Sequence, residues 1–362
     1  MSTNYQDERA YGARISDSWH YRGLKTVILE NKFIRIQIIA DKGADISSFI
    51  YKPTDTEIMF KTPWGIRNPS INVPSSGDAA SVWLDYYEGG WQTVIPHGGY
   101  PSTYYGADFG IHGDVNNIPW DTKIIEDTPE LCKVEFTGRS MRSPFEIKRL
   151  ISLKSDERFI EIHQEVTNFG EEDLDIVWLE HIAVGGTFLS EECTLTIPDC
   201  TILSHPEDVD KSSKLKPRFS GPWPFVEMKD GSLSDFRLIP GKSDRSLDMA
   251  YFTDLSDGWY VVTNNKINLS WGVEFPKELF KYIWYWRNYG GGYGYPWYGR
   301  TYNVGLEPFS SLGGGEPEPG SELRTDVKIK PGEQVSATIK AIIFKSEKGV
   351  KEINENGEID LK

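Results

Sequence analysis

The stretch Thr26-Val-Ile-Leu-Glu-Asn-Lys-Phe-Ile-Arg-Ile-Gln-Ile-Ile-Ala40 alternates apolar and polar residues on both sides of Glu30-Asn31-Lys32. A period of two sends successive side chains to opposite faces of a strand, so this stretch predicts two strands that meet at those three residues. Residues 41–45 follow as a predicted turn, in which Gly43 is suited to a positive φ. A third strand is predicted at residues 46–51. The opening of the chain therefore predicts β-structure.

The same alternation recurs along most of the chain. Further strands are predicted at residues 133–137, 145–154, 158–167, 174–179, 260–263, 269–273, 322–329 and 334–344. No stretch of helical length carries a convincing apolar stripe, because Pro and Gly interrupt nearly every candidate. The sequence therefore predicts an all-β protein, and large sandwiches or barrels can form a single domain of more than about 200 residues.

No repeat and no Pro-, Ser- or Gly-rich linker divides the chain. We therefore expect one domain over residues 1–362, with a core of about 26–344. The N-terminal 1–25 and C-terminal 345–362 segments are expected to be extensions, of which the latter frays or adds one edge strand.

Three segments depart from the alternation, and long irregular segments in compact proteins tend to carry function. Residues 62–120 contain Gly89-Gly90-Trp91-Gln92 and Pro96-His97-Gly98-Gly99. Residues 198–246 are polar and are predicted to be a surface excursion. Residues 284–300 combine Trp and Tyr with many glycines. We expect this third segment to contact a ligand, although a flexible low-complexity loop would have a similar composition.

Charge and composition narrow the partners. The formal net charge is −15 and the pI is about 5.0, which argues against nucleic acid and anionic membranes as partners. Aromatic residues reach 13% and include 12 Trp, a composition suited to a core of few large side chains and to stacking on sugar rings.

Cysteine usage and the N-terminal residues indicate a compartment. Cys132, Cys193 and Cys200 form no CxxC pair and are expected to be reduced thiols. The opening MSTNYQDERA lacks the basic and apolar regions of a signal peptide, and no window approaches about 18 uninterrupted apolar residues. The sequence therefore predicts a cytoplasmic protein.

Three acid–base side chains lie in short motifs far apart in the sequence. They are His112 in Ile111-His112-Gly113-Asp114-Val115, His181 in Trp178-Leu179-Glu180-His181, and Glu307 in Gly305-Leu306-Glu307-Pro308. Taken singly, His112 is typical of a turn residue and His181 of a buried strand histidine. Glu307 follows a short apolar strand, where a carboxylate is costly unless paired and where burial raises its pKa toward that of a general base. Together they suit proton transfer on a polyol.

The order of these motifs resembles the aldose 1-epimerase (galactose mutarotase-like) family, in a divergent branch. Residues 27–46 resemble its first hairpin and Gly-Ala turn, and Ile111-His112-Gly113 followed by Trp120 resembles its His-Gly motif. Residues 166–181 resemble the strand leading to the second family histidine, and residues 305–308 the segment with the catalytic base. The resemblance covers residues 26–344 and implies a large antiparallel β-sandwich, the galactose mutarotase-like supersandwich.

The resemblance also implies roles for residues. Glu307 is expected to take the proton of the anomeric hydroxyl while His181 protonates the ring oxygen, so that the sugar ring opens and closes again as the other anomer. His112 is expected to bind near the ring oxygen, and Asp248 to hold sugar hydroxyls. The implied partner is a monosaccharide or sugar derivative, with no cofactor and no metal, and the implied assembly is a monomer or homodimer.

Several positions depart from the family pattern. Arg67 is the available counterpart of the family arginine, and Glu180 stands where the family has Asn before the second histidine. His97 and Arg287 are candidates for a contact specific to this branch, such as an anionic substituent, because a guanidinium binds carboxylate, sulfonate or phosphate well. Trp286 and Trp297, from residues 284–300, are expected to bind the face of the ring.

Other functions stay open. A non-catalytic sugar-binding protein would need no matched acid and base. A lyase or hydrolase is the other alternative, and hydrolysis usually needs two carboxylates about 5–9.5 Å apart. Asp114, Asp248 and Glu274 are the candidates to join Glu307. A metal site from His97, His112 and Asp114 would follow no established spacing, so none is predicted.

Overall fold

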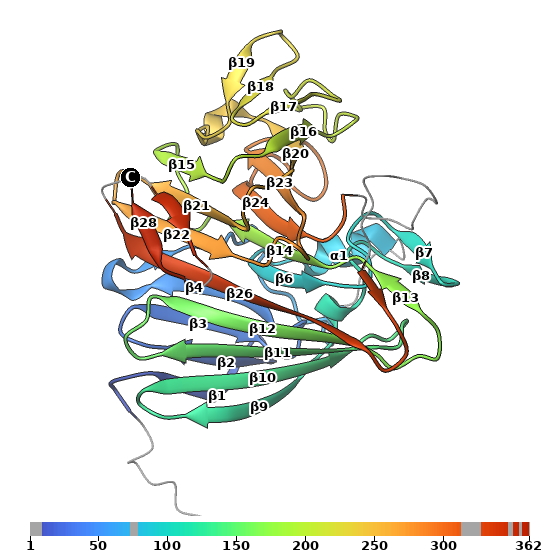
Figure 1. The fold of residues 1–362 in the computed structure, drawn as a ribbon, viewed down its shortest axis with the longest axis vertical. Helices are drawn as coiled ribbons and strands as arrows, with labels where there is room; N and C mark the ends of the chain where they lie inside the picture. Colours follow the sequence, from blue (N-terminus) through green and yellow to red (C-terminus); the bar gives the residue numbers. More distant parts are fainter. Residues whose placement is uncertain (1–8, 73–78, 313–326, 347–349, 355–356, 362) are drawn as a thin grey trace, which may run out of the picture.

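The structure is a computed structural model that describes residues 9–72, 79–312, 327–346, 350–354 and 357–361 (Figure 1). It is nearly all β, and its two large sheets are antiparallel, which confirms the predicted fold class. Among the described residues, none of the helices has the length and apolar character needed to cross a bilayer.

The first sheet contains His181 and Glu307 and runs across the whole molecule. Its strands, in spatial order, are β1 (Arg14–Tyr21), β2 (Leu24–Glu30), β3 (Ile34–Ile39), β4 (Asp45–Tyr51), β6 (Trp91–Val94), β14 (Leu179–Val184), β24 (Tyr302–Phe309), β23 (Tyr282–Tyr289), β20 (Leu247–Thr253), β16 (Thr201–Ser204) and β17 (Ser220–Pro222), with β5 (Thr56–Glu57) paired to β4. The chain enters this sheet five separate times, so its central strands come from distant parts of the sequence.

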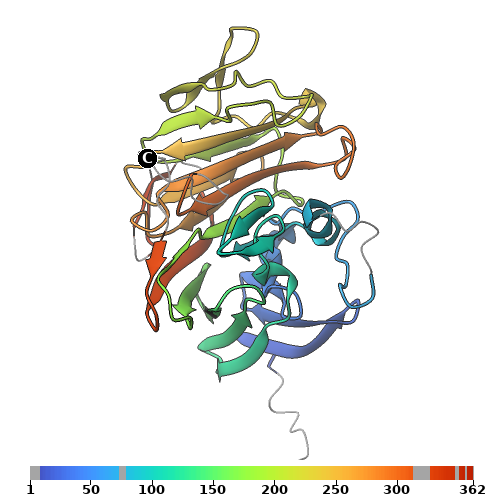
Figure 2. The ribbon, with the colours of Figure 1, turned by 90° about the vertical axis from the view of Figure 1, so that its right-hand side faces the viewer.

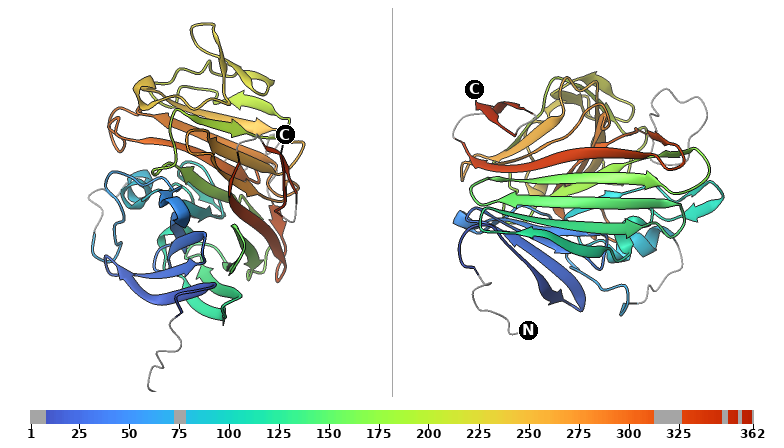
Figure 3. Two further views of the ribbon diagram at one scale, coloured as in Figure 1. Left: turned by 90° about the vertical axis from the view of Figure 1, so that its left-hand side faces the viewer. Right: turned by 60° about the horizontal axis from the view of Figure 1, so that its bottom comes forward.

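The second sheet packs against the first. Its order is β15 (Cys193–Thr196), β21 (Trp259–Asn264), β22 (Leu269–Glu274), β26 (Gln334–Lys345), β12 (Phe159–Asn168), β11 (Phe145–Lys154), β10 (Leu131–Arg139) and β9 (Asp121–Asp127). Figure 3 shows the long strands of this sheet lying side by side. In β10, Cys132, Val134 and Phe136 are fully buried while the residues between them are not, as period-two alternation requires. The main hydrophobic core lies between the two sheets.

Short elements cover the ends of the sandwich. They are the hairpins β7–β8 (Ser102–Tyr104, Ala107–Phe109), β18–β19 (Phe225–Glu227, Leu233–Asp235) and β27–β28 (Val350–Ile353, Ile359–Leu361), the pair β13–β25 (Leu174–Ile176, Val327–Ile329), the helix α1 (Ala79–Tyr86), and the 3₁₀ turns η2 (Lys52–Thr54), η3 (Val115–Asn117) and η4 (Lys242–Asp244). Figure 2 shows β18–β19 projecting at one end. The rest of the predicted surface excursion is not all at the surface, because β16 and β17 belong to the first sheet and Ile202 and Phe236 lie in the core.

The predicted turn at residues 41–45 lies against the backbone of residues 116–118, which follow His112 in the sequence. Gly43 has φ +66°, and a Cβ at this position would lie 2.7 Å from the backbone of Asn116. The Gly43 N–H donates to the carbonyl of Ile118 at 2.8 Å. Glycine is therefore required here both for the backbone conformation and for the close approach.

Several boundaries differ from the prediction. Residues 284–289 belong to β23 rather than to an irregular loop, and Trp91–Val94 form the central strand β6. Within the N-terminal extension, β1 adds an edge strand to β2, and the C-terminal segment forms a hairpin. Of the strand predicted at 322–329, only residues 327–329 are among those described.

Candidate active site

Strand register brings His181 and Glu307 together. Strand β14 pairs with β24 so that Leu179 lies opposite Phe309 and Ala183 opposite Gly305. The same antiparallel register puts His181 opposite Glu307, although 126 positions separate them in the sequence. Cross-strand neighbours on one face lie about 4.5–5.5 Å apart at their Cβ atoms, so the two side chains contact each other.

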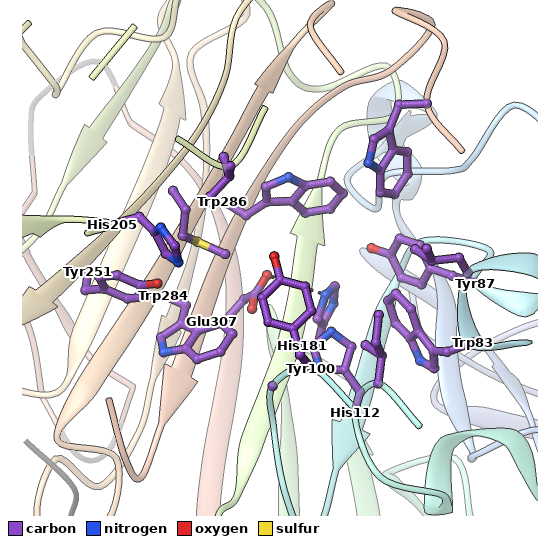
Figure 4. A pocket seen from close by; sticks show the side chains of 16 residues that line it. Trp83, Tyr87, Tyr100, His112, His181, His205, Tyr251, Trp284, Trp286 and Glu307 are labelled. Atoms are coloured by element: carbon purple, nitrogen blue, oxygen red, sulfur yellow. Dashed lines mark ion pairs between the residues drawn. The ribbon is translucent and has the colours of Figure 1, made fainter. Parts of the chain in front are cut away.

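This pair belongs to a row of side chains that crosses five strands on one face. His181 is the register partner of Gln92 in β6, Glu307 of Trp284 in β23, and Trp284 of Tyr251 in β20. Four of these side chains line a cavity of about 210 Å³ on the outer face of the first sheet: His181, Glu307, Trp284 and Tyr251 (Figure 4). The sheet therefore forms the floor of the cavity.

His181 and Glu307 are close to each other but do not form a hydrogen bond. The distance from His181 Nε2 to Glu307 Oε1 is 3.6 Å, and both side chains are almost entirely buried. Among the described residues, Glu307 Oε1 and His181 Nδ1 have no hydrogen-bond partner. Buried polar atoms without partners are costly, so their gathering around a cavity indicates a place for a polar ligand.

Gly305 makes room for the carboxyl group. It is two residues before Glu307, on the same face of β24, and a Cβ there would lie 2.3 Å from Glu307 Oε1 and 3.0 Å from the Cβ of Trp286. Any larger residue would push the carboxyl out of its present position. The Gly-Leu-Glu spacing thus has a steric reason.

Burial determines the charge state of the pair. Burial lowers the pKa of His181 to about 4, and it raises the pKa of Glu307 well above its usual value. The contact distance alone would allow an ion pair, but removal from water favours the neutral form of each group. Burial therefore favours the neutral imidazole of His181 and the protonated carboxyl of Glu307.

His112 is the second imidazole of the cavity. Its Nδ1 lies 2.6 Å from the carbonyl oxygen of Gly98, and because a carbonyl only accepts, Nδ1 carries the hydrogen and Nε2 the lone pair. Burial, and then the neighbouring His181, lower the pKa of His112 well below its usual value. The two rings lie 5.1 Å apart. The neutral His112 thus presents an acceptor beside the pair.

A buried charge cluster supports the His112 loop. Lys42 Nζ lies 2.8 Å from Asp45 Oδ2 and 2.7 Å from Glu88 Oε2, and all three side chains are removed from water. Lys42 also donates to the carbonyl of Asn116 at 3.5 Å, and the Asn116 amide donates to the His112 carbonyl at 3.0 Å. This chain of contacts explains how the backbone of His112, which has φ +63°, is held.

Aromatic side chains form most of the cavity wall. Trp83 stacks on Tyr87 with ring centroids 4.6 Å apart, and Trp286 packs on Trp297 at 5.1 Å. Trp284 meets Tyr251 edge to face at 5.7 Å. The predicted residues Trp286 and Trp297 both line the cavity, the first from β23 and the second from the loop that follows it.

Two predicted substrate contacts lie on the opposite face of the sheet. Arg287 alternates with Trp286 along β23, and its guanidinium carbon lies 3.5 Å from the centroid of the Phe236 ring. Asp248 alternates with Met249 along β20, and its Oδ1 accepts from the backbone N–H groups of Lys214 and Leu215. Neither residue lines the cavity.

The structure also keeps His97 and Arg67 out of the cavity lining. His97 is buried, with its ring 5.6 Å from that of Phe109. Arg67 donates to the carbonyl of Asp85 at 2.8 Å and lies over Trp64, which in turn packs on Trp297. Arg67 therefore lies beyond the aromatic rim of the cavity.

Other cavity residues were not predicted. His205 directly follows β16, in the segment expected to be a surface excursion, and Trp83 lies in the short helix α1. Tyr100 lines the mouth of the cavity and is exposed. A Trp within a loop-like sequence was the available signal for Trp83, whereas His205 had none. Within the described ranges, no group of three or more His, Cys, Asp and Glu side chains is arranged to hold a metal ion.

Solved structures share this fold. A protein from Klebsiella pneumoniae, provisionally named an aldose 1-epimerase, is 14% identical, with a TM-score of 0.72 over 92% of this chain and 84% of its own. A galactose mutarotase-like protein from Clostridium acetobutylicum is also 14% identical, with a TM-score of 0.60 over 92% and 99%. At such identities the likeness concerns the fold alone. The fold class is thus the galactose mutarotase-like β-sandwich.

The sequence itself identifies the family. Residues 21–343 match the family described as "Domain of unknown function (DUF4432)", and the chain belongs to that family. None of the curated proteins compared with it matches the chain.

Proposed function

We propose that this protein is a carbohydrate-active isomerase of the aldose 1-epimerase type, which interconverts the anomers of a sugar. The observation that carries the proposal is the His181–Glu307 pair, opposed on neighbouring strands in an aromatic cavity. The names of the structural neighbours, aldose 1-epimerase and galactose mutarotase-like protein, point in the same direction.

The proposed reaction needs one mobile proton. The anomeric hydroxyl and the ring oxygen are bonded to the same carbon, so an acid and a base 3.6 Å apart can reach both. One group takes the hydroxyl proton as the other protonates the ring oxygen, the bond from C1 to the ring oxygen breaks, and the aldehyde forms. Rotation about C1–C2 and the reverse transfers give the other anomer. No atom or electron is gained or lost overall.

The protonation states of His181 and Glu307 determine which of them is the acid and which the base. The assignment expected from family resemblance, His181 as acid and Glu307 as base, begins from an ion pair. Because burial favours the neutral forms, we propose that protonated Glu307 donates to the ring oxygen and neutral His181 takes the hydroxyl proton. Ring closure then uses the same groups in reverse. Positioned acid and base groups contribute about 100- to 10,000-fold each.

The rest of the cavity suits a pyranose. His112 Nε2 is placed to accept a hydrogen bond from a hydroxyl near the pair, and Trp284 and Trp286 present aromatic surface beside it (Figure 4). We propose no role at the site for Asp248, Arg287, His97 or Arg67, since none of them lines the cavity.

The alternatives receive less support. Glu307 is the single carboxyl side chain among the described residues that line the cavity, whereas two-carboxylate hydrolysis needs a partner within about 10 Å. Glu274 lies on the other sheet, and Asp114 accepts from the backbone N–H groups of Met141 and Arg142. A protein that only binds sugar would have no need of the unpartnered acid–base pair.

Replacement of Glu307 by Gln tests the proposal. Saturation-transfer NMR across a panel of aldoses would follow anomer interconversion. We expect the wild type to accelerate exchange for at least one sugar, Glu307→Gln to lower the rate at least 100-fold, and binding of that sugar to survive. Glu274→Gln is the matched control and should keep the wild-type rate. A wild type that accelerates no neutral sugar, sugar acid or sugar phosphate would refute the enzyme proposal.

We also propose that residues 1–362 form one domain. Both large sheets combine strands from early and late parts of the chain, and the family match runs without interruption from 21 to 343. Limited proteolysis followed by unfolding of the fragments would test this, because a single domain should give no fragment that refolds alone.

A further inference from the structure

The cavity wall includes aliphatic as well as aromatic side chains. Leu84, Ile111, Val209 and Met249 all line the cavity, and all four pack on a single hydrophobic cluster that includes Trp83 and Trp286. They are only partly buried. An apolar surface of this kind, held open to a cavity, is typical of a site whose ligand carries apolar groups of its own.

The cavity also offers no permanent counter-charge for an anion. Among its described lining residues there is no Lys and no Arg, and His205 is its third imidazole. Burial keeps His112 and His181 neutral by lowering the pKa of each. The guanidinium of Arg287 packs on Phe236 at the opposite face of the sheet. A carboxylate, sulfonate or phosphate would thus lose its water without meeting a Lys or Arg side chain in the described lining.

Three acid–base side chains meet at the proposed reaction centre, and other polar groups of the lining include the Tyr87 hydroxyl and the indole N–H groups of Trp83 and Trp284. His181, Glu307 and His112 meet at one place, with the buried Tyr87 ring 5.2 Å from that of His181. A hydroxyl that lies against the aliphatic side chains would find no partner among them, whereas a methyl group at the same place would bury apolar surface.

We propose that the cavity selects an uncharged sugar in which an apolar group replaces a hydroxyl, of which a 6-deoxyhexose is the simplest case. This inference rests on the proposed function, since it places the reducing end at His181 and Glu307 and the apolar group at the aliphatic side chains. Val209 and Met249 are then specificity-determining residues. The cavity volume of about 210 Å³ is below the roughly 300–1,000 Å³ of pockets for drug-sized ligands, which suits a single sugar ring.

Matched sugars test the inference directly. The pairs are 6-deoxy-D-glucose with D-glucose and 6-deoxy-L-galactose with L-galactose, and D-glucuronic acid is the charged member. Dissociation constants would be measured by tryptophan fluorescence on Glu307→Gln, and exchange rates by saturation-transfer NMR on the wild type. In at least one pair we expect the deoxy sugar to bind roughly 10- to 100-fold more tightly than its parent, and the acid to bind most weakly.

A near-isosteric substitution locates the preference. Val209→Thr introduces a hydroxyl into the aliphatic wall and should reduce the deoxy preference several-fold. Val327→Thr, in β25 and outside the cavity lining, makes the same chemical change as a control and should preserve the preference.

The outcomes separate the two proposals. Equal or tighter binding of the parent hexoses, no binding of any neutral sugar, or a preference unchanged in Val209→Thr would each overturn the inference. A deoxy preference in binding, together with no acceleration of anomer exchange by the wild type, would support the ligand class and reject the isomerase. Exchange without any deoxy preference would keep the isomerase and reject the ligand class.

Discussion

Glu180 and Glu307 are both buried carboxyl groups in neighbouring strands, yet their surroundings differ completely. Glu180 points between the two sheets, where it accepts from the indole N–H of Trp91 at 2.6 Å and of Trp178 at 2.9 Å. Arg149, from the second sheet, lies 3.8 Å away. Glu307 points out of the sandwich into the cavity, where its Oε1 lies 3.6 Å from His181 Nε2.

The comparison shows that a carboxyl with a structural role and a carboxyl available for chemistry differ in how completely they are hydrogen-bonded. Burial raises the pKa of both groups, but Arg149 and the indole donors oppose the rise at Glu180, whereas no comparable donor does so at Glu307. A carboxyl whose lone pairs are occupied holds the two sheets together. One whose lone pairs are unoccupied beside a cavity is available to a ligand.

The largest effect should come from breaking the structural carboxyl. Glu180→Leu leaves Arg149 buried without its ion-pair partner, so we expect the free energy of unfolding to fall by about 3–5 kcal/mol. Urea denaturation would measure it. The double variant Glu180→Leu/Arg149→Met should recover much of the loss because it removes both charges. A loss below about 1 kcal/mol in the single variant would contradict the structural role.

The second prediction concerns the free energy of unfolding at acid pH, to which His181 contributes. The pKa of His181 is about 4 in the folded protein, against an ordinary value of 6.5. The unfolded chain therefore binds more protons between these pH values, and the contribution of the neutral imidazole, complete above pH 6.5, is lost as the pH falls through about 4. We expect a loss on the order of 3 kcal/mol, since each pKa unit corresponds to about 1.4 kcal/mol.

His181→Gln should remove this part of the pH dependence. Unfolding free energies of the wild type and the variant, measured from pH 7 to pH 4, give the difference due to His181 alone. His20→Gln is a suitable control because His20 is exposed in the edge strand β1. If the two proteins showed parallel profiles, or if His181 titrated near pH 6.5 by NMR, the buried neutral imidazole would be wrong.

The third prediction extends the comparison to Glu307 at higher pH. Its folded pKa is raised, so its contribution to stability is present below about pH 4.5 and is lost as the pH rises through the folded value. Glu307→Gln cannot ionise and should become progressively more stable than the wild type, by up to about 1.4 kcal/mol for each pH unit within that window. Thermal unfolding at pH 5, 7 and 9 would check this. A constant difference would indicate an ionised Glu307 at all three pH values.

Alternating polarity makes several strands visible in the sequence, whereas β23 has no such alternation and was missed. Strands β10, β11 and β12 alternate buried and less buried residues, and their pattern is visible in the sequence. Strand β23 is buried at all eight positions and therefore reads Tyr-Ile-Trp-Tyr-Trp-Arg-Asn-Tyr, with no alternation of polarity.

The missed strand had a consequence for the site. Once residues 282–289 form a strand, alternation puts Trp284 and Trp286 on one face and Arg287 on the other. The interpretation of Arg287 as an anion clamp depended on a loop. His181 and Glu307 could be selected from their motifs, but their contact depends on the register of β14 with β24, which no local pattern determines. The position of His205 at the cavity also depends on how distant segments pair, so the sequence did not predict it.

The smallest effect should come from Arg67, which lies beyond the cavity rim. Its guanidinium is about one-third exposed and meets Asp85 Oδ1 at 3.5 Å, a geometry that contributes at most about 1 kcal/mol to stability. Arg67→Ala should therefore change neither sugar binding nor exchange rate by more than about twofold. Trp297→Ala, which removes part of the cavity wall, should weaken binding about tenfold. A tenfold loss of sugar binding in Arg67→Ala would instead mean that the ligand extends past Trp297 and Trp64. The substrate would then contact polar residues outside the aromatic cavity.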